Sequence, residues 1–236
     1  MSKKFVTEET ISNLPKPVQK YMRYTGLVGS PWIISVRLTQ VGKFRPGKER
    51  PWMGFRAEEF YTTNPPSFRW KAKFKMFGIP LLKAEDKYEK GHGRMYGDLL
   101  GIKTIFDEVG EIMDQACMVR YLNEIMWFPT AFLGNNIRWK ELDDNTAQVK
   151  FTDNDREVEA QMYFDDDGRL KNFMAKRYRE NAGKYSLDQW STPITSYGEF
   201  AGLKLPQKGL AIWHLPDGDL PYIELEIKEI EYQVAT

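Results

Sequence analysis

The sequence predicts a mainly β protein with minor α content, in which an antiparallel meander of about eleven strands forms a closed or half-open barrel. Apolar and polar residues alternate through most of the chain from Trp32 to Tyr232, which is the period of a half-buried strand. Short turn sequences rich in Asp, Asn, Gly and Pro separate these runs at regular intervals, which favours a meander over βαβ units. Aromatic residues make up 14% of the chain, and their rings suit either a bulky core or an apolar cavity.

A helical segment is expected over residues 1–30, followed by a barrel-like body over residues 32–232. Thr7 is a suitable N-cap for a first helix, and Pro17 suits the first turn of a second. No linker or internal repeat divides the chain, so a single domain over residues 1–236 is the economical organisation.

The clearest strand is expected at residues 68–76, where even and odd positions differ completely in character. The apolar face holds Phe68, Trp70, Ala72, Phe74 and Met76. The basic face holds Arg69, Lys71, Lys73 and Lys75. We interpret the basic face as a solvated outer surface, with contact to anionic head groups or to a partner as the alternative. Neighbouring strands are expected at 32–44, 54–63, 82–90 and 93–100.

A helix is expected at about 111–126, and its apolar residues cover well over half of its circumference. Such a helix is covered on several sides, so we expect it to cover or plug a barrel too wide to be filled by strand side chains. An apolar cavity remains if the helix fills only part of that space. Strands then resume at 137–142, 146–152, 157–164, 169–179, 185–200 with a break at Pro193, 205–215 and 221–232.

Three charged residues share the apolar face of their strands. Asp86 shares the parity of Leu82 and Ala84, Glu59 that of Ala57, and Arg177 follows Phe173 and Ala175 on the same side. An unpaired buried charge is costly, so we expect Arg177 to meet Asp86, Glu59 or both. The pair either fixes strand register or anchors the head group of a ligand. The candidate ligand-binding residues are Tyr61, Trp70, Phe74, Asp86, Tyr88, Arg177, Trp190 and His214.

Other chemistry is poorly supported. With two histidines and one cysteine the chain is poor material for a transition-metal site, and no metal or cofactor is expected. Cys117 is interpreted as a buried, inert thiol. The Asp-rich segments 153–155 and 165–168 lack the spacing of a calcium loop and are interpreted as turns. No nucleophile elbow, phosphate loop or dinucleotide fingerprint is present.

Composition also limits partners and location. The 34 basic and 33 acidic residues give a net charge of +1. This charge is too small to attract the negatively charged backbone of a nucleic acid, so a nucleic-acid partner is disfavoured. The start of the chain lacks the apolar core of a signal peptide, and no apolar run is long enough for a membrane span. The expected location is therefore cytoplasmic, or extracytoplasmic and close to a membrane if an anchor precedes the sequence.

Three functions follow as hypotheses. The favoured one is a binding or carrier protein for an apolar or amphipathic, lipid-like small molecule in the barrel interior. The alternative is an enzyme in which Asp86 or Glu59 acts as a base, with a pKa raised by the apolar surroundings and assistance from Tyr61 or His214. A structural or interaction module is the third, favoured by an apolar patch on the outer surface.

Four short motifs make the chain resemble an uncharacterised bacterial family without an established activity. They are Leu14-Pro15-x-Pro17-Val18-Gln19-x-Tyr21, Pro51-Trp52-Met53 with Glu58 to Tyr61, Trp127-Phe128-Pro129-Thr130-Ala131 and Trp213-His214-Leu215-Pro216-Asp217-Gly218-Asp219. Family members often begin with a hydrophobic anchor before the first motif, from which this sequence departs. In element order the chain is also loosely similar to the periplasmic carriers of lipoproteins, whose half-open barrels shelter acyl chains.

Overall fold

The structure is a computed structural model that describes residues 4–76, 79–181 and 183–233. The side chain of Met76, which was expected on the apolar face of its strand, is not among the described side chains. In the described part of the chain, no helix is both long and apolar enough to cross a membrane.

Two short helices open the chain, as the sequence predicts. Helix α1 spans Glu8–Ile11, and the side chain of Thr7 caps it by accepting a hydrogen bond from the backbone N–H of Thr10 at 3.2 Å. Helix α2 spans Lys16–Tyr24, with Pro17 in its first turn. The buried Tyr21 hydroxyl donates to the carbonyl of Met126 at 2.9 Å, which ties α2 to the middle of the chain.

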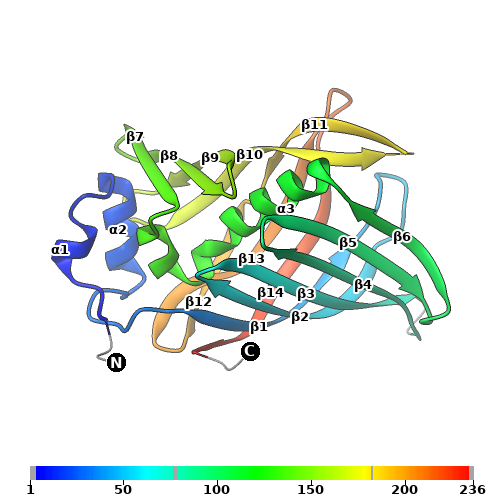
Figure 1. Ribbon diagram of the computed structural model, residues 1–236, viewed down its shortest axis with the longest axis horizontal. Helices are drawn as coiled ribbons and strands as arrows, with labels where there is room; N and C mark the ends of the chain where they lie inside the picture. The colour runs from blue at the N-terminus through cyan, green and yellow to red at the C-terminus, as the bar shows by residue number, and fades with distance from the viewer. Residues whose placement is uncertain (1–3, 77–78, 182, 234–236) are drawn as a thin grey trace.

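A single antiparallel sheet makes up most of the rest of the protein (Figure 1). Its strands are β1 (Ser35–Phe44), β2 (Met53–Thr63), β3 (Pro66–Met76), β4 (Ile79–Glu89), β5 (His92–Leu99), β6 (Lys103–Val109), β7 (Ile137–Asp143), β8 (Thr146–Asp153), β9 (Arg156–Phe164), β10 (Leu170–Asn181), β11 (Lys184–Ser191), β12 (Ile194–Phe200), β13 (Leu203–His214) and β14 (Leu220–Tyr232). The order across the sheet is β6-β5-β4-β3-β2-β1-β14-β13-β11-β10-β9-β8-β7, and β12 pairs with β13 off this path.

The sheet has 14 strands, so the expected number of about eleven was too low. Strand β6 was missed because its residues are almost all exposed and show no alternation of apolar and polar side chains. The expected strand 185–200 is two strands, and the break falls at Thr192-Pro193 between β11 and β12. Pro193 cannot donate a ladder hydrogen bond, which explains why the pairing is interrupted there.

The sheet curls into a half-open barrel, and β6 and β7 are its two edges. Helix α3 (Glu111–Glu124) lies along the concave side and packs against β5 from one half of the sheet and β10 from the other (Figure 1). Two 3₁₀ turns, Ile125–Trp127 and Pro129–Leu133, extend its apolar surface. The expected helix at 111–126 is therefore present, and it covers the concave face.

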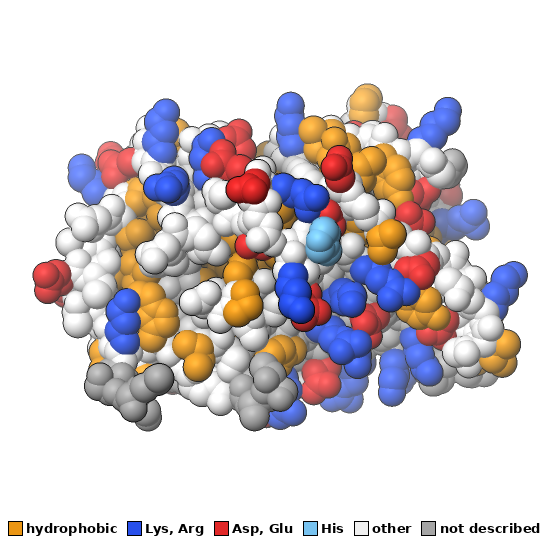
Figure 2. Space-filling view, viewed as in Figure 1, with side chains coloured by type: hydrophobic (Ala, Val, Ile, Leu, Met, Phe, Trp, Pro, Cys, Tyr) orange, Lys and Arg blue, Asp and Glu red, His pale blue; other side chains and the backbone are white. Residues whose placement is uncertain are grey.

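The aromatic residues converge on one core between α3 and the sheet. Tyr61 of β2 lies 4.9 Å from Phe128 between ring centroids, and Tyr121 of α3 lies 5.1 Å from Phe151 of β8. Trp70 and Phe74 are both buried, so the expected inner face of β3 is correct. On the outside, basic and acidic side chains are intermixed over much of the visible face (Figure 2).

Candidate functional site

Three buried carboxylates meet one guanidinium beneath α3. Arg120 Nη2 lies 2.8 Å from Glu59 Oε1, and Arg120 Nη1 lies 2.6 Å from Asp86 Oδ2. Arg120 Nε lies 3.0 Å from Glu124 Oε1, one turn along the same helix. All three carboxylates are buried, Glu59 completely. We call these four residues the charge cluster.

The sheet register explains how the cluster assembles. Glu59 of β2 pairs with Trp70 of β3, and Trp70 pairs with Asp86 of β4. Residues directly opposite each other share one face of a sheet, so the two carboxylates lie on either side of the Trp70 ring. Arg120 reaches down from α3, and its guanidinium carbon lies 4.9 Å from the Trp70 ring centroid, within cation–π range.

The prediction that Arg177 contacts these carboxylates was wrong. Arg177 is buried on the inner face of β10, but its Nε donates to the backbone carbonyl of Ala116 at 3.0 Å. Its guanidinium carbon lies 5.0 Å from the Trp190 ring centroid, and its Nη1 donates to the Tyr222 hydroxyl at 3.4 Å. Arg177 therefore belongs to a second, neighbouring group of rings.

Sequence reasoning missed Arg120 because it sought partners for the inward carboxylates on the strands alone. One signal could have found it. Arg120 is the only basic residue between Glu111 and Glu124. A helix covered on several sides must bury such a charge, and a buried charge needs a partner.

The balance of charge in the cluster favours uptake of a proton. Burial raises the pKa of Glu59 to about 8, with Arg120 opposing the shift and Glu124 adding to it. Burial also raises the pKa of Asp86 and of Glu124, again opposed by Arg120. One guanidinium does not offset the desolvation of three carboxylates. Burial therefore favours the protonated form of the carboxyl groups in this cluster.

Neutral side chains donate hydrogen bonds to most of the carboxylate oxygens that Arg120 does not contact. Gln40 Nε2 donates to Glu59 Oε2 at 2.7 Å, and Trp70 Nε1 donates to Gln40 Oε1 at 3.0 Å. The Tyr61 hydroxyl donates to Glu124 Oε2 at 2.7 Å. Asp86 Oδ1 is the exception in the cluster, because it is buried and accepts no hydrogen bond from any described residue.

A row of small residues lies next to the cluster on the concave face. The register places Ala57, Ala72, Ala84 and Gly97 directly opposite one another on β2, β3, β4 and β5. On one side of this alanine row lie Glu59, Trp70 and Asp86, two residues along their strands in each case. The three alanines are therefore the low part of the face, bordered by the charge cluster, whereas the Phe106 ring covers Gly97.

Large apolar side chains border the alanine row on its other side. Phe55, Phe74 and Leu82 face one another across β2, β3 and β4, and the Phe55 and Phe74 ring centroids are 5.5 Å apart. Trp70 and Ala84 each keep 9% of their surface exposed, whereas Tyr61 and Tyr88 keep none. Solvent therefore reaches the concave face from the alanine-row side.

The other predicted site residues lie in different places. Trp190 packs on Arg177 and donates its indole N–H to the Tyr222 hydroxyl at 3.1 Å. Tyr88 stacks on Phe68, and its hydroxyl donates to Asp153 Oδ2 at 2.5 Å. The structure therefore brings Trp70, Phe74 and Asp86 together beside the alanine row, and places Tyr61 and Tyr88 farther inside the core, on either side of Phe68.

His214 does not join the interior set. It follows the buried Trp213, so its side chain points to the opposite face of β13. Its Nε2 is 2.8 Å from Ser191 Oγ, and its Nδ1 is 2.8 Å from Asp219 Oδ1. This order resembles a nucleophile, base and acid, but Ser191 is only 2% exposed, so we assign the chain of hydrogen bonds to fixing the turn before β14.

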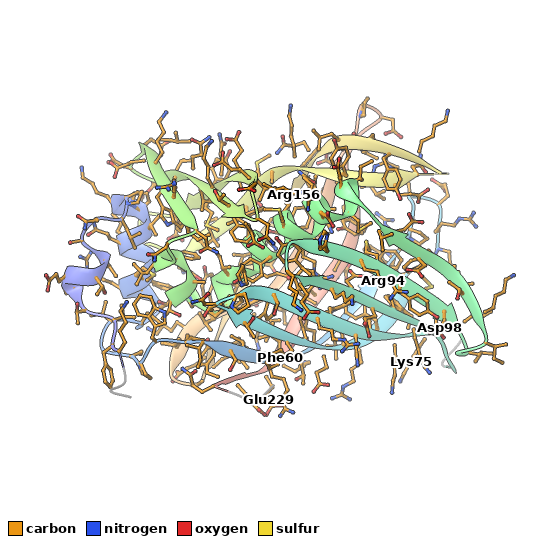
Figure 3. All side chains as sticks on the ribbon, viewed as in Figure 1. Phe60, Lys75, Arg94, Asp98, Arg156 and Glu229 are labelled. Carbon is orange, nitrogen blue, oxygen red and sulfur yellow. The ribbon has the colours of Figure 1, made fainter. Side chains whose placement is uncertain are left out.

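Two of the clefts on the described surface lie away from the rings of the predicted site. One, of about 370 Å³, lies at the start of α3 and includes Lys87, His92 and Asp114. Arg156 lies beside this end of α3 and contacts Asp114 Oδ2 at 2.6 Å (Figure 3). The other, of about 450 Å³, includes Arg179 and lies between the β1–β2 loop and the β13–β14 turn.

Metal and thiol chemistry gain no support from the geometry. Within the described residues, no three His, Cys, Asp or Glu side chains group as a metal site. Cys117 is buried against Gly93, and burial raises the pKa of its thiol to about 12. The thiol is therefore protonated at neutral pH and unreactive.

Comparison with known proteins places the sequence in a family. Residues 4–225 match the family model of DUF6544, which is described as a family of unknown function. The chain belongs to the DUF6544 family. No curated protein matches its sequence.

Two solved structures resemble this DUF6544 protein in fold. A LolA superfamily protein from Nitrosomonas europaea aligns with a TM-score of 0.47 and 8% identity, over 93% of each chain. A DUF1329 family protein from Desulfovibrio piger aligns with a TM-score of 0.43 and 9% identity, over 95% of each chain.

Proposed function

We propose that this protein binds an amphipathic small molecule on its concave face. The apolar part of the ligand lies along the alanine row, and its head group donates a hydrogen bond to Asp86 Oδ1. The observation that carries the proposal is this buried carboxylate oxygen, which no described residue satisfies, beside a row of small side chains.

The charge cluster favours a head group that donates a hydrogen bond and carries no negative charge. A buried acceptor without a partner costs free energy, and a ligand donor removes that cost. Glu59, Asp86 and Glu124 outnumber Arg120 in the cluster. An added anion would be repelled there, so we expect a hydroxyl or an amine and not a carboxylate or phosphate.

The alanine row supports an apolar tail. Three neighbouring strands contribute Ala57, Ala72 and Ala84, and strands lie about 4.8 Å apart, so the row is about 10 Å long up to Gly97, where the Phe106 ring ends it. The bordering Phe55 and Phe74 rings provide apolar contact along it. A flexible alkyl chain suits this shape better than a rigid polycyclic ligand.

Binding can be tested with three probes of equal length, namely dodecanol, dodecylamine and dodecanoate, by titration of tryptophan fluorescence. We expect the alcohol or the amine to bind and the carboxylate to bind at least about tenfold more weakly, because one lost charge-assisted contact is worth about 1.4 kcal/mol or more. Lipids extracted from the purified protein and identified by mass spectrometry give the natural ligand class.

The matched variants are Ala72→Phe, in the middle of the alanine row, and Ala160→Phe, an equally buried alanine on β9. We expect Ala72→Phe to abolish binding by filling the row and Ala160→Phe to retain it, with circular dichroism confirming that both variants fold. Binding that survives Ala72→Phe, or no binding of any probe, would contradict the proposal.

An enzyme is the second candidate, and the raised pKa of Glu59, at about 8, favours it. Both Glu59 oxygens already accept hydrogen bonds, from Arg120 and Gln40, so Asp86 with its open Oδ1 is the better base. Turnover of the bound ligand that is lost in Asp86→Asn while binding persists would support catalysis. A ligand recovered unchanged after prolonged incubation would favour carriage.

A further inference from the structure

Aliphatic side chains project into solvent at the turn between β5 and β6. Leu100 is 55% exposed and Ile102 is 86% exposed, on either side of Gly101. Ile105, on the adjoining part of β6, is also exposed. Large aliphatic side chains grouped this way on a surface often mark a contact site. We call Leu100, Ile102 and Ile105 the hairpin tip.

A row of unpaired cations lies on the outer face of the neighbouring strands. The register places Arg56 opposite Lys73, and Lys73 opposite Lys83. Like charges directly opposite one another destabilise a sheet. None of the three forms an ion pair within residues 4–76, 79–181 and 183–233. We call Arg56, Lys73 and Lys83 the basic row.

The basic row ends at the hairpin tip. A Cβ placed on Gly101 would lie 3.8 Å from Lys83 Nζ, so this ammonium group lies against the turn that carries Leu100 and Ile102. Lys75, also exposed and basic, lies at the same end of the molecule as Asp98, just before the turn (Figure 3). Several Lys and Arg side chains lie around this end of β3, β4 and β5, with Asp and Glu side chains among them (Figure 2).

We propose that the hairpin tip and the basic row dock this protein on the surface of an anionic lipid bilayer. Aliphatic side chains enter the boundary between head groups and acyl chains, while lysines beside them contact anionic head groups. The tip is a projecting turn and not a concave groove, which suits insertion into a fluid surface. The inference stands independently of the ligand proposed above.

The cost of the basic row supports the same conclusion. A sheet gains nothing from three adjacent like charges in water, whereas each lysine or arginine near an anionic membrane strengthens attachment about fivefold. Glu85 contacts Arg69 and Lys71, on the adjacent part of β3, so the unpaired charge is concentrated toward the hairpin tip. Asp98 of β5 lies directly opposite Lys83, so its carboxylate offsets part of the positive charge at the end of the row nearest the tip.

Vesicle flotation tests the proposal with the whole chain. One set of vesicles is phosphatidylcholine alone, and the other is phosphatidylcholine mixed with phosphatidylglycerol. We expect the protein to float with the mixed vesicles only, and the bound fraction to fall as salt is raised, since salt screens exposed charges.

Two double variants separate the contributions. Lys73→Glu with Lys83→Glu reverses the charge of the basic row, and we expect the partition coefficient to fall by more than about tenfold. Leu100→Ser with Ile102→Ser removes the aliphatic contact, and we expect a similar loss. The matched control, Lys140→Glu with Leu142→Ser, changes exposed residues on β7 at the far edge of the sheet and should bind normally.

Several outcomes would overturn docking on a bilayer. These are no binding to the mixed vesicles, equal binding to both vesicle types, or loss in the control as large as in the double variants. Binding of a purified acidic protein through the basic row, without vesicle binding, would assign the surface to a protein partner instead. All changed residues are exposed, so thermal unfolding should match that of the unaltered protein in each variant.

Discussion

At the scale of single residues, the protein depends on Arg120. Its guanidinium contacts Glu59, Asp86 and Glu124, which come from two strands and one helix. Buried ion pairs add little stability compared with apolar residues, but removing one member leaves the others uncompensated. Arg120 is therefore the residue whose loss the core tolerates least.

We expect Arg120→Met to lower the free energy of unfolding by about 3 to 5 kcal/mol at neutral pH, because three carboxylates lose their counter-charge. Urea unfolding measures the change. The control is Arg23→Met, which removes an exposed ion pair with Glu8 and should change stability little. A similar, small effect of both substitutions would show that the cluster is not electrostatically strained.

The pH dependence of stability should report on Glu59. Its pKa is raised from 4.5 to about 8 in the folded protein, so between these values the folded state binds more protons than the unfolded chain. Stability is then present below pH 4.5 and is lost as the pH rises toward 8, by up to about 1.4 kcal/mol per pH unit for one proton.

Comparing the chain with Glu59→Gln isolates this contribution from the other carboxylates. We expect the variant to lose less stability than the unaltered protein between pH 5 and 8, as measured by urea unfolding at several pH values. Glu124→Gln should act in the same direction, because the negative charge of Glu124 contributes to the raised pKa of Glu59. If the free energy of unfolding changed with pH in the same way for all three proteins, a raised pKa of Glu59 would be contradicted.

Alternation of side chains predicted the burial of Glu59, Asp86 and Arg177, since the face of a strand residue follows from its parity. It could not predict their partners. Parity says which face a residue is on, whereas a contact depends on how the helix and strands pack. Arg177 and Asp86 share the interior, but α3 lies between their strands and supplies Arg120 to one and a backbone carbonyl to the other.

At the scale of elements, helix α3 packs closely against β5. Gly110 precedes the helix and has no side chain to cap it. Instead Asp114, in the first turn, accepts a hydrogen bond from the backbone N–H of Gly93 at 2.7 Å and contacts Arg156. The start of the helix is thus fixed to the sheet.

Gly93→Ala should disturb this contact. A Cβ at this position would lie 2.5 Å from the carbonyl oxygen of Met113 and 2.8 Å from Cys117 Sγ, so the helix would have to move away from the strand. We expect a loss of about 1 to 3 kcal/mol in urea unfolding. The control is Gly54→Ala on β2, where the nearest atom is 4.0 Å away; equal effects would show that α3 adjusts freely.

The elements that the sequence predicted well are those with one apolar face. Strand β3 and helix α3 belong to this group, because burial on one or more sides leaves a period in the sequence. Strand β6 leaves none, since it is an edge strand whose side chains are mostly in solvent. Its place in the sheet comes from backbone pairing with β5, which side-chain patterns do not record.

At the scale of the whole molecule, the half-open barrel was one of two expected outcomes, and the strand order was not predicted. Turns predict neighbours along the chain, so the meanders β1 to β6 and β7 to β11 follow from local signals. The pairing of β1 with β14 joins residues almost 200 positions apart. No local pattern encodes that contact.

Strand β14 has a consequence for how the protein is made. It pairs with β1 on one side and β13 on the other, so within the sheet it is the sole connection between the first six strands and the remainder. It also follows both of its partners in the chain, so it leaves the ribosome after them. Until then the chain holds two incomplete sheets, and the open flanks of β1 and β13 are free to pair with other copies. Emergence of β14 from the ribosome therefore ends the period in which the flanks of β1 and β13 are open to aggregation.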